Sequence, residues 1–161
     1  MRRPSARRGF SLAELLCAAL ALCVLAGAAA LSFRDTGERR IVLEEAEELR
    51  AWLSSRMAYA AREGADFRLV ANSLYGSNAV DIRIEWYNGT RGFTSETYRA
   101  QRADIWRDGN VIKEHVFDGE WFTLTPAASF IIRSRRERDI AALVTVSGVE
   151  YVDVKETLKE Q

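Results

Sequence analysis

The sequence is poor in the residues that most often build metal and redox sites, with one histidine and two cysteines in 161 residues. His115 has no cysteine or tight carboxylate cluster beside it, which favours a structural role over metal binding. Cys17 and Cys23 both lie inside an apolar run, where a free thiol packs as a small hydrophobic side chain. We therefore expect no metal site and no cofactor.

Local motifs of catalysis are also missing. The sequence has no nucleophile motif, no phosphate-binding loop and no dinucleotide-binding fingerprint. Asp104, Asp108 and Asp118 are spaced like turn residues rather than like the ligands of a calcium loop. We expect a protein that is not an enzyme.

Proline is scarce, and none interrupts the interval 10–62. A helix of about 50 residues is therefore permitted there. In its second part, over residues 34–63, apolar residues recur at spacings of three and four, which is typical of an amphipathic helix. These residues are Val42, Ala46, Leu49, Leu53, Met57 and Ala60. Gly64 is the expected stop signal.

Charged residues of the same segment are expected on its solvent side. They are Glu44, Glu45, Glu47, Glu48 and Arg50. Glu47 and Arg50 have the spacing of an i,i+3 ion pair, which stabilises an exposed helix face.

Charge is segregated at the N-terminus. The first eight residues hold four arginines and no acidic residue, and the apolar run 10–33 contains a single charge, Glu14. The run is long enough to span a bilayer, and the preceding arginines predict a cytoplasmic N-terminus with the remainder outside the cytoplasm. Without those arginines, 19 basic residues face 23 acidic ones, which is not typical of a general nucleic-acid binder.

The N-terminal segment allows several interpretations. It could be a plain membrane anchor, a general secretory signal cut near Ala30, or a twin-arginine signal that begins at Arg7-Arg8-Gly9-Phe10. Glu14 argues against both secretory signals, because a carboxylate interrupts what should be a continuous apolar core.

A further interpretation accounts for Glu14. The stretch Gly9-Phe10-Ser11-Leu12-Ala13-Glu14-Leu15-Leu16 resembles the class III signal of type IV prepilins and type II secretion pseudopilins. The resemblance implies that a prepilin peptidase removes residues 1–9 by cutting between Gly9 and Phe10, and that the new amino terminus is methylated. Residues 10–33 would then remain as a transmembrane and assembly helix. The implied partners are the peptidase, the inner membrane and other pilin or pseudopilin subunits.

The residue types suit that chemistry. Gly9 lacks a Cβ and allows the close approach of a peptidase's catalytic carboxylates. A carboxylate in a bilayer costs roughly 2.5 kcal/mol near a helix centre and less near an end, so Glu14 needs a partner. The resemblance implies pairing with the positive terminus at Phe10 of a neighbouring subunit, which would set the axial register of a filament.

From residue 64 to the end, the pattern changes to strands. Nine are predicted, at 67–71, 80–87, 92–99, 105–107, 111–117, 121–124, 130–133, 143–147 and 151–155. Asn88-Gly89 and Asp108-Gly109-Asn110 have the chemistry of hairpin turns. We expect an α+β fold in which residues 64–161 form an antiparallel sheet against the second half of the helix.

Two features of this region favour a minor subunit. Residues 143–152, a strand, a Ser/Gly turn and a final strand, resemble the close of FimT/GspH-like minor pilins and pseudopilins. The chain also lacks the paired C-terminal cysteines of many major pilins.

A basic cluster consists of Arg133, Arg135, Arg136 and Arg138. The simplest interpretation is a solvated loop between two strands, with nearby acidic residues partly cancelling its charge. The alternative is contact with nucleic-acid phosphates during DNA uptake, which some FimT-like subunits perform.

The sequence therefore leaves two functions of different classes open. The first is a structural subunit of a filament, and the second is a soluble domain exported by a twin-arginine or general signal. The position of the mature N-terminus separates them.

Overall fold

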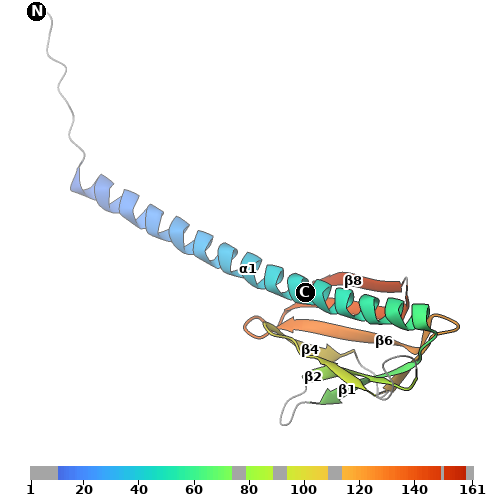
Figure 1. The fold of residues 1–161 in the computed structure, drawn as a ribbon. Helices are drawn as coiled ribbons and strands as arrows, with labels where there is room; N and C mark the ends of the chain where they lie inside the picture. The colour runs from blue at the N-terminus through green and yellow to red at the C-terminus, as the bar shows by residue number, and fades with distance from the viewer. Residues whose placement is uncertain (1–10, 74–78, 89–93, 109–113, 150, 159–161) are drawn as a thin grey trace, which may run out of the picture. The chain divides into compact units, whose positions relative to one another are not determined.

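The computed structural model describes residues 11–73, 79–88, 94–108, 114–149 and 151–158 (Figure 1). The chain divides into two compact units, residues 1–36 and 37–161. The predicted cleavage site at Gly9 and Phe10 lies outside the described residues, as do the predicted turn residues Gly89, Gly109 and Asn110.

A single helix, α1, runs from Leu12 to Glu63. It ends where the sequence predicts, because Gly64 adopts a positive φ of 59° that an L-residue with a Cβ rarely accepts. The N–H of Ala65 then donates to the carbonyl of Ala60 at 2.9 Å, which is the closing bond of a Schellman motif.

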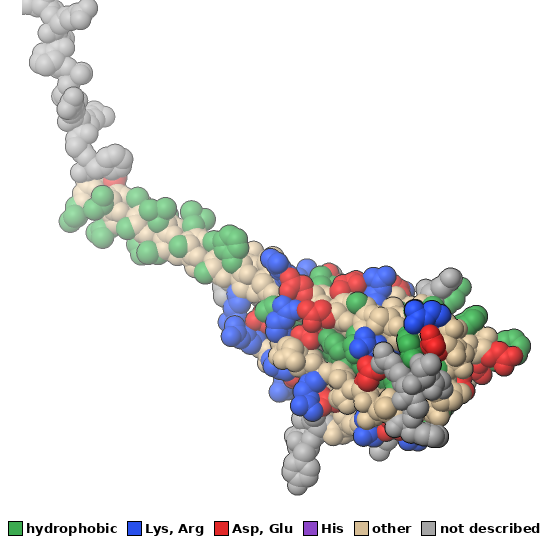
Figure 2. All heavy atoms as spheres, in the orientation of Figure 1, with side chains coloured by type: hydrophobic (Ala, Val, Ile, Leu, Met, Phe, Trp, Pro, Cys, Tyr) green, Lys and Arg blue, Asp and Glu red, His purple; other side chains and the backbone are tan. Residues whose placement is uncertain are grey.

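In the first unit, α1 is apolar and its described side chains are exposed. Figure 2 shows hydrophobic side chains gathered along this part of the helix. By length and composition, α1 is long and apolar enough to cross a membrane. The helix therefore meets the length and composition of a membrane span, while the predicted bounds 10–33 stay a prediction.

The second unit contains an antiparallel sheet of eight strands. They are β1 (Phe67–Ser73), β2 (Val80–Trp86), β3 (Ser95–Tyr98), β4 (Ala103–Arg107), β5 (Glu114–Asp118), β6 (Thr123–Ser134), β7 (Ile140–Gly148) and β8 (Tyr151–Leu158). The order is β3-β2-β1-β5-β6-β7-β8, and β4 pairs with β6 beside β5. The predicted α+β arrangement is therefore confirmed.

Two sequence predictions about the strands are wrong. Residues 121–124 and 130–133 do not form separate strands, because residues 123–134 belong to the single strand β6. Asp108 does not begin a hairpin between β4 and β5, since β4 pairs with β6 and β5 pairs with β1. The long strand β6 offers one part of its edge to β5 and another part to β4, which lets both strands bury an apolar face.

The connection between β2 and β3 does form a hairpin. These strands pair antiparallel, and the N–H of Trp86 donates to the carbonyl of Thr94 at 2.9 Å. Asn88 lies just after β2, although it bonds to Asp66 rather than closing a two-residue turn.

The core lies between one face of the sheet and residues 37–63 of α1, which run along that face (Figure 1). The predicted apolar stripe of α1, from Val42 to Ala60, is buried throughout. Opposite it, the rings of Phe67 and Phe117 stack with centroids 4.8 Å apart, and Trp86 packs edge-on against Phe67. Burial of such side chains contributes roughly 1.5–3 kcal/mol each.

Candidate functional site

The N-terminal end of α1 is closed by a capping box between Ser11 and Glu14. The backbone N–H of Ser11 donates to Oε2 of Glu14 at 2.9 Å, and the N–H of Glu14 donates to Oγ of Ser11 at 3.2 Å. This reciprocal pair satisfies N–H groups that have no partner within a helix. The Ser-x-x-Glu spacing before an apolar run was readable from the sequence, and our sequence analysis missed it.

The capping box gives Glu14 a role within its own chain. A carboxylate in the first turn also interacts favourably with the positive end of the helix dipole. Only Oε2 accepts the bond from the Ser11 N–H, so Oε1 can accept a bond from a cationic group. Capping and pairing with a neighbouring subunit are therefore compatible.

Arg135, in the predicted basic cluster, is occupied by structural bonds. Its guanidinium donates to Oδ1 of Asp104 at 2.9 Å and to the carbonyls of Gln101 and Ala103 at 2.9 and 3.0 Å. These bonds tie the end of β6 to the connection before β4. Arg135 remains exposed between β6 and β7, as predicted, although its guanidinium is engaged in these bonds.

The other arginines of the cluster differ in exposure. Arg133 is half-buried, and its guanidinium carbon lies 5.0 Å from the centroid of the Trp106 ring. Arg136 and Arg138 are exposed in the connection between β6 and β7, and 78% of the Arg136 side chain is accessible. We call residues 135–138 the basic turn.

Glu45 is buried, which corrects its predicted place on the solvent side of α1. Its side chain is 0% exposed. Oε1 accepts from the Tyr98 hydroxyl at 3.1 Å and from the N–H of Gln101 at 3.0 Å, and Oε2 accepts from the N–H of Arg102 at 3.0 Å. The carboxylate therefore holds the connection between β3 and β4 against the helix.

The surroundings of Glu45 favour the protonated forms of Tyr98 and Arg102. Burial, and then the negative charge of Glu45, raise the pKa of the Tyr98 hydroxyl, so it remains a donor at neutral pH. A hydrogen bond to Glu44 raises the pKa of Arg102, whose guanidinium also contacts Glu48 at 3.1 Å.

Glu38 plays a similar role for the connection that follows β6. It is buried, and its Oε2 accepts from the Ser134 hydroxyl at 2.7 Å, while its Oε1 lies 3.6 Å from Nη1 of Arg136. Oγ of Ser134 in turn accepts from the N–H groups of Arg136 and Glu137 at 3.1 and 3.0 Å. The basic turn is thus fixed to the helix at its base while the side chains of Arg136 and Arg138 remain exposed.

A second surface feature is a groove of about 490 Å³ that we call the aromatic groove. It is lined by Ala61, Trp121, Phe122, Thr123, Ser147, Gly148, Val149 and Tyr151. Trp121 and Tyr151 are 72% and 70% exposed, and Phe122 is 49% exposed. The sequence analysis placed Trp121 and Phe122 in a strand and did not identify this surface.

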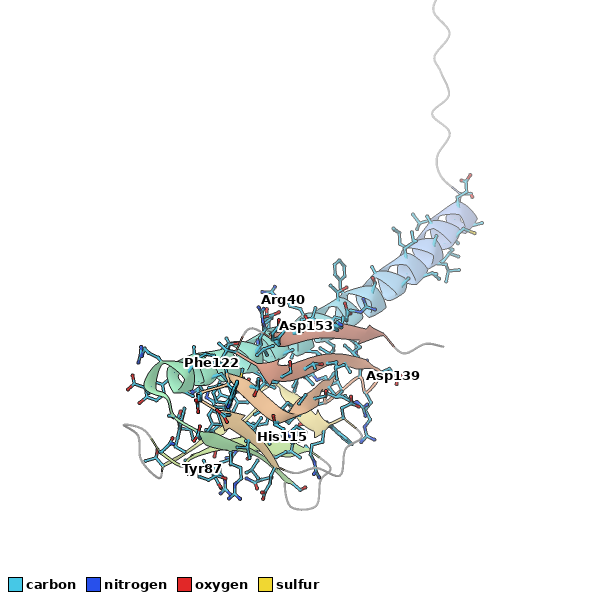
Figure 3. The ribbon with its side chains drawn as sticks, turned by 90° about the vertical axis from the view of Figure 1, so that its right-hand side faces the viewer. Arg40, Tyr87, His115, Phe122, Asp139 and Asp153 are labelled. Carbon is cyan, nitrogen blue, oxygen red and sulfur yellow. The ribbon has the colours of Figure 1, made fainter. Side chains whose placement is uncertain are left out.

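His115 has the structural position that the sequence predicts. It is buried on β5, and its Nδ1 lies 2.8 Å from the carbonyl oxygen of Pro126 (Figure 3). Within the described residues, no group of three or more His, Cys, Asp or Glu side chains could hold a metal ion. Asp118 caps a turn, as its spacing predicts, since it accepts from the N–H groups of Glu120 and Trp121.

No family model, curated protein or solved structure matches this chain. The features that bear on function are therefore its own: the apolar, capped start of α1, the basic turn and the aromatic groove.

Proposed function

We propose that the protein is a structural subunit, a minor pilin or pseudopilin, of a type IV pilus or type II secretion-like filament. A prepilin peptidase cuts between Gly9 and Phe10, and the new amino terminus is methylated. Residues 10–33 hold the chain in the inner membrane and later pack with other subunits. The β-rich unit lies outside the cytoplasm.

One observation carries this proposal: α1 is a single helix of 52 residues whose two parts have opposite environments. Its first part is apolar and exposed, and its second part supplies the buried stripe from Val42 to Ala60. An export signal is discarded, so it needs no continuity with the core helix of the exported domain. A helix that serves as both anchor and core element suits a subunit that keeps its N-terminal segment.

The chemistry of assembly follows from the capped helix start. Cleavage before Phe10 creates an ammonium group about one helical turn from Glu14. In a bundle of apolar helices, an unpaired carboxylate is penalised, so a neighbour's ammonium group is a strong partner. Oε1 of Glu14 can accept it while Oε2 keeps its bond to Ser11.

Processing provides the direct test. Coexpression with a prepilin peptidase is expected to yield a chain that begins at methylated Phe10, as measured by N-terminal mass spectrometry. Gly9→Val should leave the leader attached, because its branched side chain blocks the approach of the peptidase. Ala6→Val, a similar change elsewhere in the leader, should be processed normally.

The alternative is a soluble domain exported by a twin-arginine or general signal. Its core would survive a cut near Ala30, since the buried stripe begins at Val42. A mature terminus near Leu31 in the same mass spectra would establish this alternative and overturn the filament proposal.

A further inference from the structure

The turn that carries Trp121 is held rigidly although its aromatic side chain points into solvent. Oδ1 of Asp118 accepts from the N–H groups of Glu120 and Trp121 at 2.8 and 3.0 Å. The N–H of Phe122 donates to the carbonyl of Asp118 at 2.9 Å, and the N–H of Gly119 donates to Asp66 at 2.9 Å. A tryptophan on a fixed backbone loses less conformational freedom on binding than one on a mobile loop.

Close packing fixes the same turn from both sides. A Cβ on Gly119 would lie 2.5 Å from the carbonyl oxygen of Ala65, and one on Gly148 would lie 2.7 Å from that of Phe122. Phe122 itself has a positive φ of 56°, which is unfavourable for a bulky L-residue. Backbone strain of this kind clusters at binding sites, where the surrounding structure maintains it.

The chemistry of the aromatic groove selects a cationic partner. Its lining residues carry no charge, and they include three exposed aromatic rings, those of Trp121, Phe122 and Tyr151, whose π faces are electron-rich. Cations bind such faces, tryptophan best of all, and arginine is the most frequent protein cation there. Glu120, the exposed residue that precedes Trp121 in the sequence, carries a negative charge.

The chain itself carries a matching cation at the opposite end of the same strand. β6 begins at Thr123, in the groove, and ends at Ser134, next to the basic turn. Twelve strand residues span roughly 35–40 Å. Figure 3 places Phe122 and Asp139 at opposite ends of the sheet. Groove and turn therefore cannot meet within one molecule.

We propose that the aromatic groove receives the basic turn of a second copy of this chain. Arg138 and Arg136 of one copy lie against the rings of Trp121 and Tyr151 of the next. The contact is head-to-tail, so each bound copy presents a free groove at one end and a free turn at the other. Such contacts propagate into open assemblies rather than closing into a dimer.

This inference rests on the filament proposal for its setting, but it uses surfaces of the β-rich unit alone. Interaction through the turn suits its construction, because Glu38 and Ser134 anchor its base and leave most of the Arg136 side chain accessible. The partner chosen is another copy rather than nucleic acid, since Arg135 is already occupied by Asp104 and backbone carbonyls.

Cysteine crosslinking of the full chain in detergent solution tests the contact. Both native cysteines are first replaced, by Cys17→Ala and Cys23→Ala. One preparation then carries Ser147→Cys in the groove, and a second carries Asp139→Cys beside the basic turn. After mixing and oxidation with copper phenanthroline, we expect a disulfide-linked dimer between the two preparations.

A control pair of cysteine variants measures the crosslinking that random collision produces. Ser95→Cys places the thiol on the exposed edge strand β3, away from both surfaces. The Ser147→Cys and Ser95→Cys mixture should crosslink about tenfold less. Dimers that form equally well in the Ser147→Cys preparation alone would indicate a symmetric contact and overturn the head-to-tail proposal. Absence of crosslinking above the collision level would also overturn it.

Side-chain variants identify the contact that carries binding. Trp121→Ala in the groove copy, or Arg138→Gln in the turn copy, should lower the yield of the mixed dimer about fivefold. Arg40→Gln removes a different exposed arginine and should change nothing. Circular dichroism of each variant checks that the sheet remains folded.

The two proposals fail separately. If processing occurs at Phe10 but no mixed dimer forms, the filament role stands and the contact is wrong. If the dimer forms but the terminus lies near Leu31, the contact stands without the filament role. If Arg138→Gln abolishes salt-dependent binding of duplex DNA while no dimer forms, the partner of the basic turn is nucleic acid.

Discussion

Two glutamates, Glu38 and Glu45, lie on the core side of α1 and are almost completely removed from water. A buried carboxylate is costly unless hydrogen bonds satisfy it. Each of these carboxylates accepts such bonds at the end of a strand or just after it: from Tyr98, Gln101 and Arg102 for Glu45, and from Ser134 for Glu38. They fix loops to the helix where an apolar side chain could not.

We predict that Glu45→Ala lowers the free energy of unfolding by about 3–5 kcal/mol, because it leaves several buried donors without a partner. Glu48→Ala removes an exposed acid that contacts the same Arg102, and it should cost no more than about 1 kcal/mol. Denaturant unfolding of the full chain in detergent, followed by tryptophan fluorescence, measures both. Equal effects of the two changes would contradict the anchoring role of Glu45.

The burial of Glu45 could be predicted in part from the sequence. Glu45 stands three residues after Val42 and four before Leu49, so its spacing already placed it on the buried face. Its charge led us to assign it to solvent. The partners could not be predicted, because Tyr98 and the backbone of Gln101 and Arg102 lie far along the chain and come near only in the folded unit.

The features of α1 that depend on nearby residues were predicted correctly from the sequence. Its end at Gly64, its apolar stripe and the ion pair between Glu47 and Arg50 were all predicted, and the pair is present at 2.9 Å. Each depends on residues within a few positions of one another. Strand pairing is different, because it joins residues that lie far apart in the sequence. β4 pairs with β6, and β5 pairs with β1 and β6, and no local signal in β4 or β5 specifies these partners.

Mutation can separate the capping role of Glu14 from its proposed role in filament assembly. Glu14→Gln keeps an oxygen that accepts from Ser11 but removes the charge, whereas Glu14→Ala removes both. We expect normal cleavage and membrane insertion for both variants. We also expect both to be incorporated poorly into filaments, because both lose the charge pair that we propose with a neighbour's terminus.

Ser11→Ala is the matched control. It weakens the cap, typically by about 1 kcal/mol, and leaves the charge in place, so incorporation should be largely kept. The measurement is the share of each variant in sheared filaments. Wild-type incorporation of Glu14→Gln would show that capping, rather than charge, is what assembly requires.

For the whole molecule, the arrangement of the arginines limits any binding to nucleic acid. Arg135 is bound to Asp104 and backbone carbonyls, and Arg133 packs on Trp106. Arg136, which is 78% exposed despite a 3.6 Å contact with Glu38, and the exposed Arg138 are the members of the cluster best placed to reach a phosphate. The sequence predicted a cluster of four. It could not show that the fold uses half of that cluster internally, because the groups involved come from β4 and the connection before it.

We therefore predict weak, non-specific binding of duplex DNA by the full chain, in the micromolar range or weaker. The slope of log affinity against log salt should be no steeper than about −1.8, the value for two phosphate contacts at about −0.9 each. Titration of a labelled duplex at several salt concentrations measures it. A slope near roughly −3.6 would indicate four contacts and contradict the internal use of Arg133 and Arg135.

The position of β4 in the sheet also has a consequence for the order in which the chain folds. β4 finds its pairing partner in residues 130–134 of β6, and β5 must return to β1. As the polypeptide emerges from its N-terminal side during synthesis, residues 103–107 remain without that ladder until Ser134 has emerged. Pairing across such separations is slow compared with helix formation. The β-rich unit therefore completes its fold late, after most of its length is already exposed to chaperones and proteases.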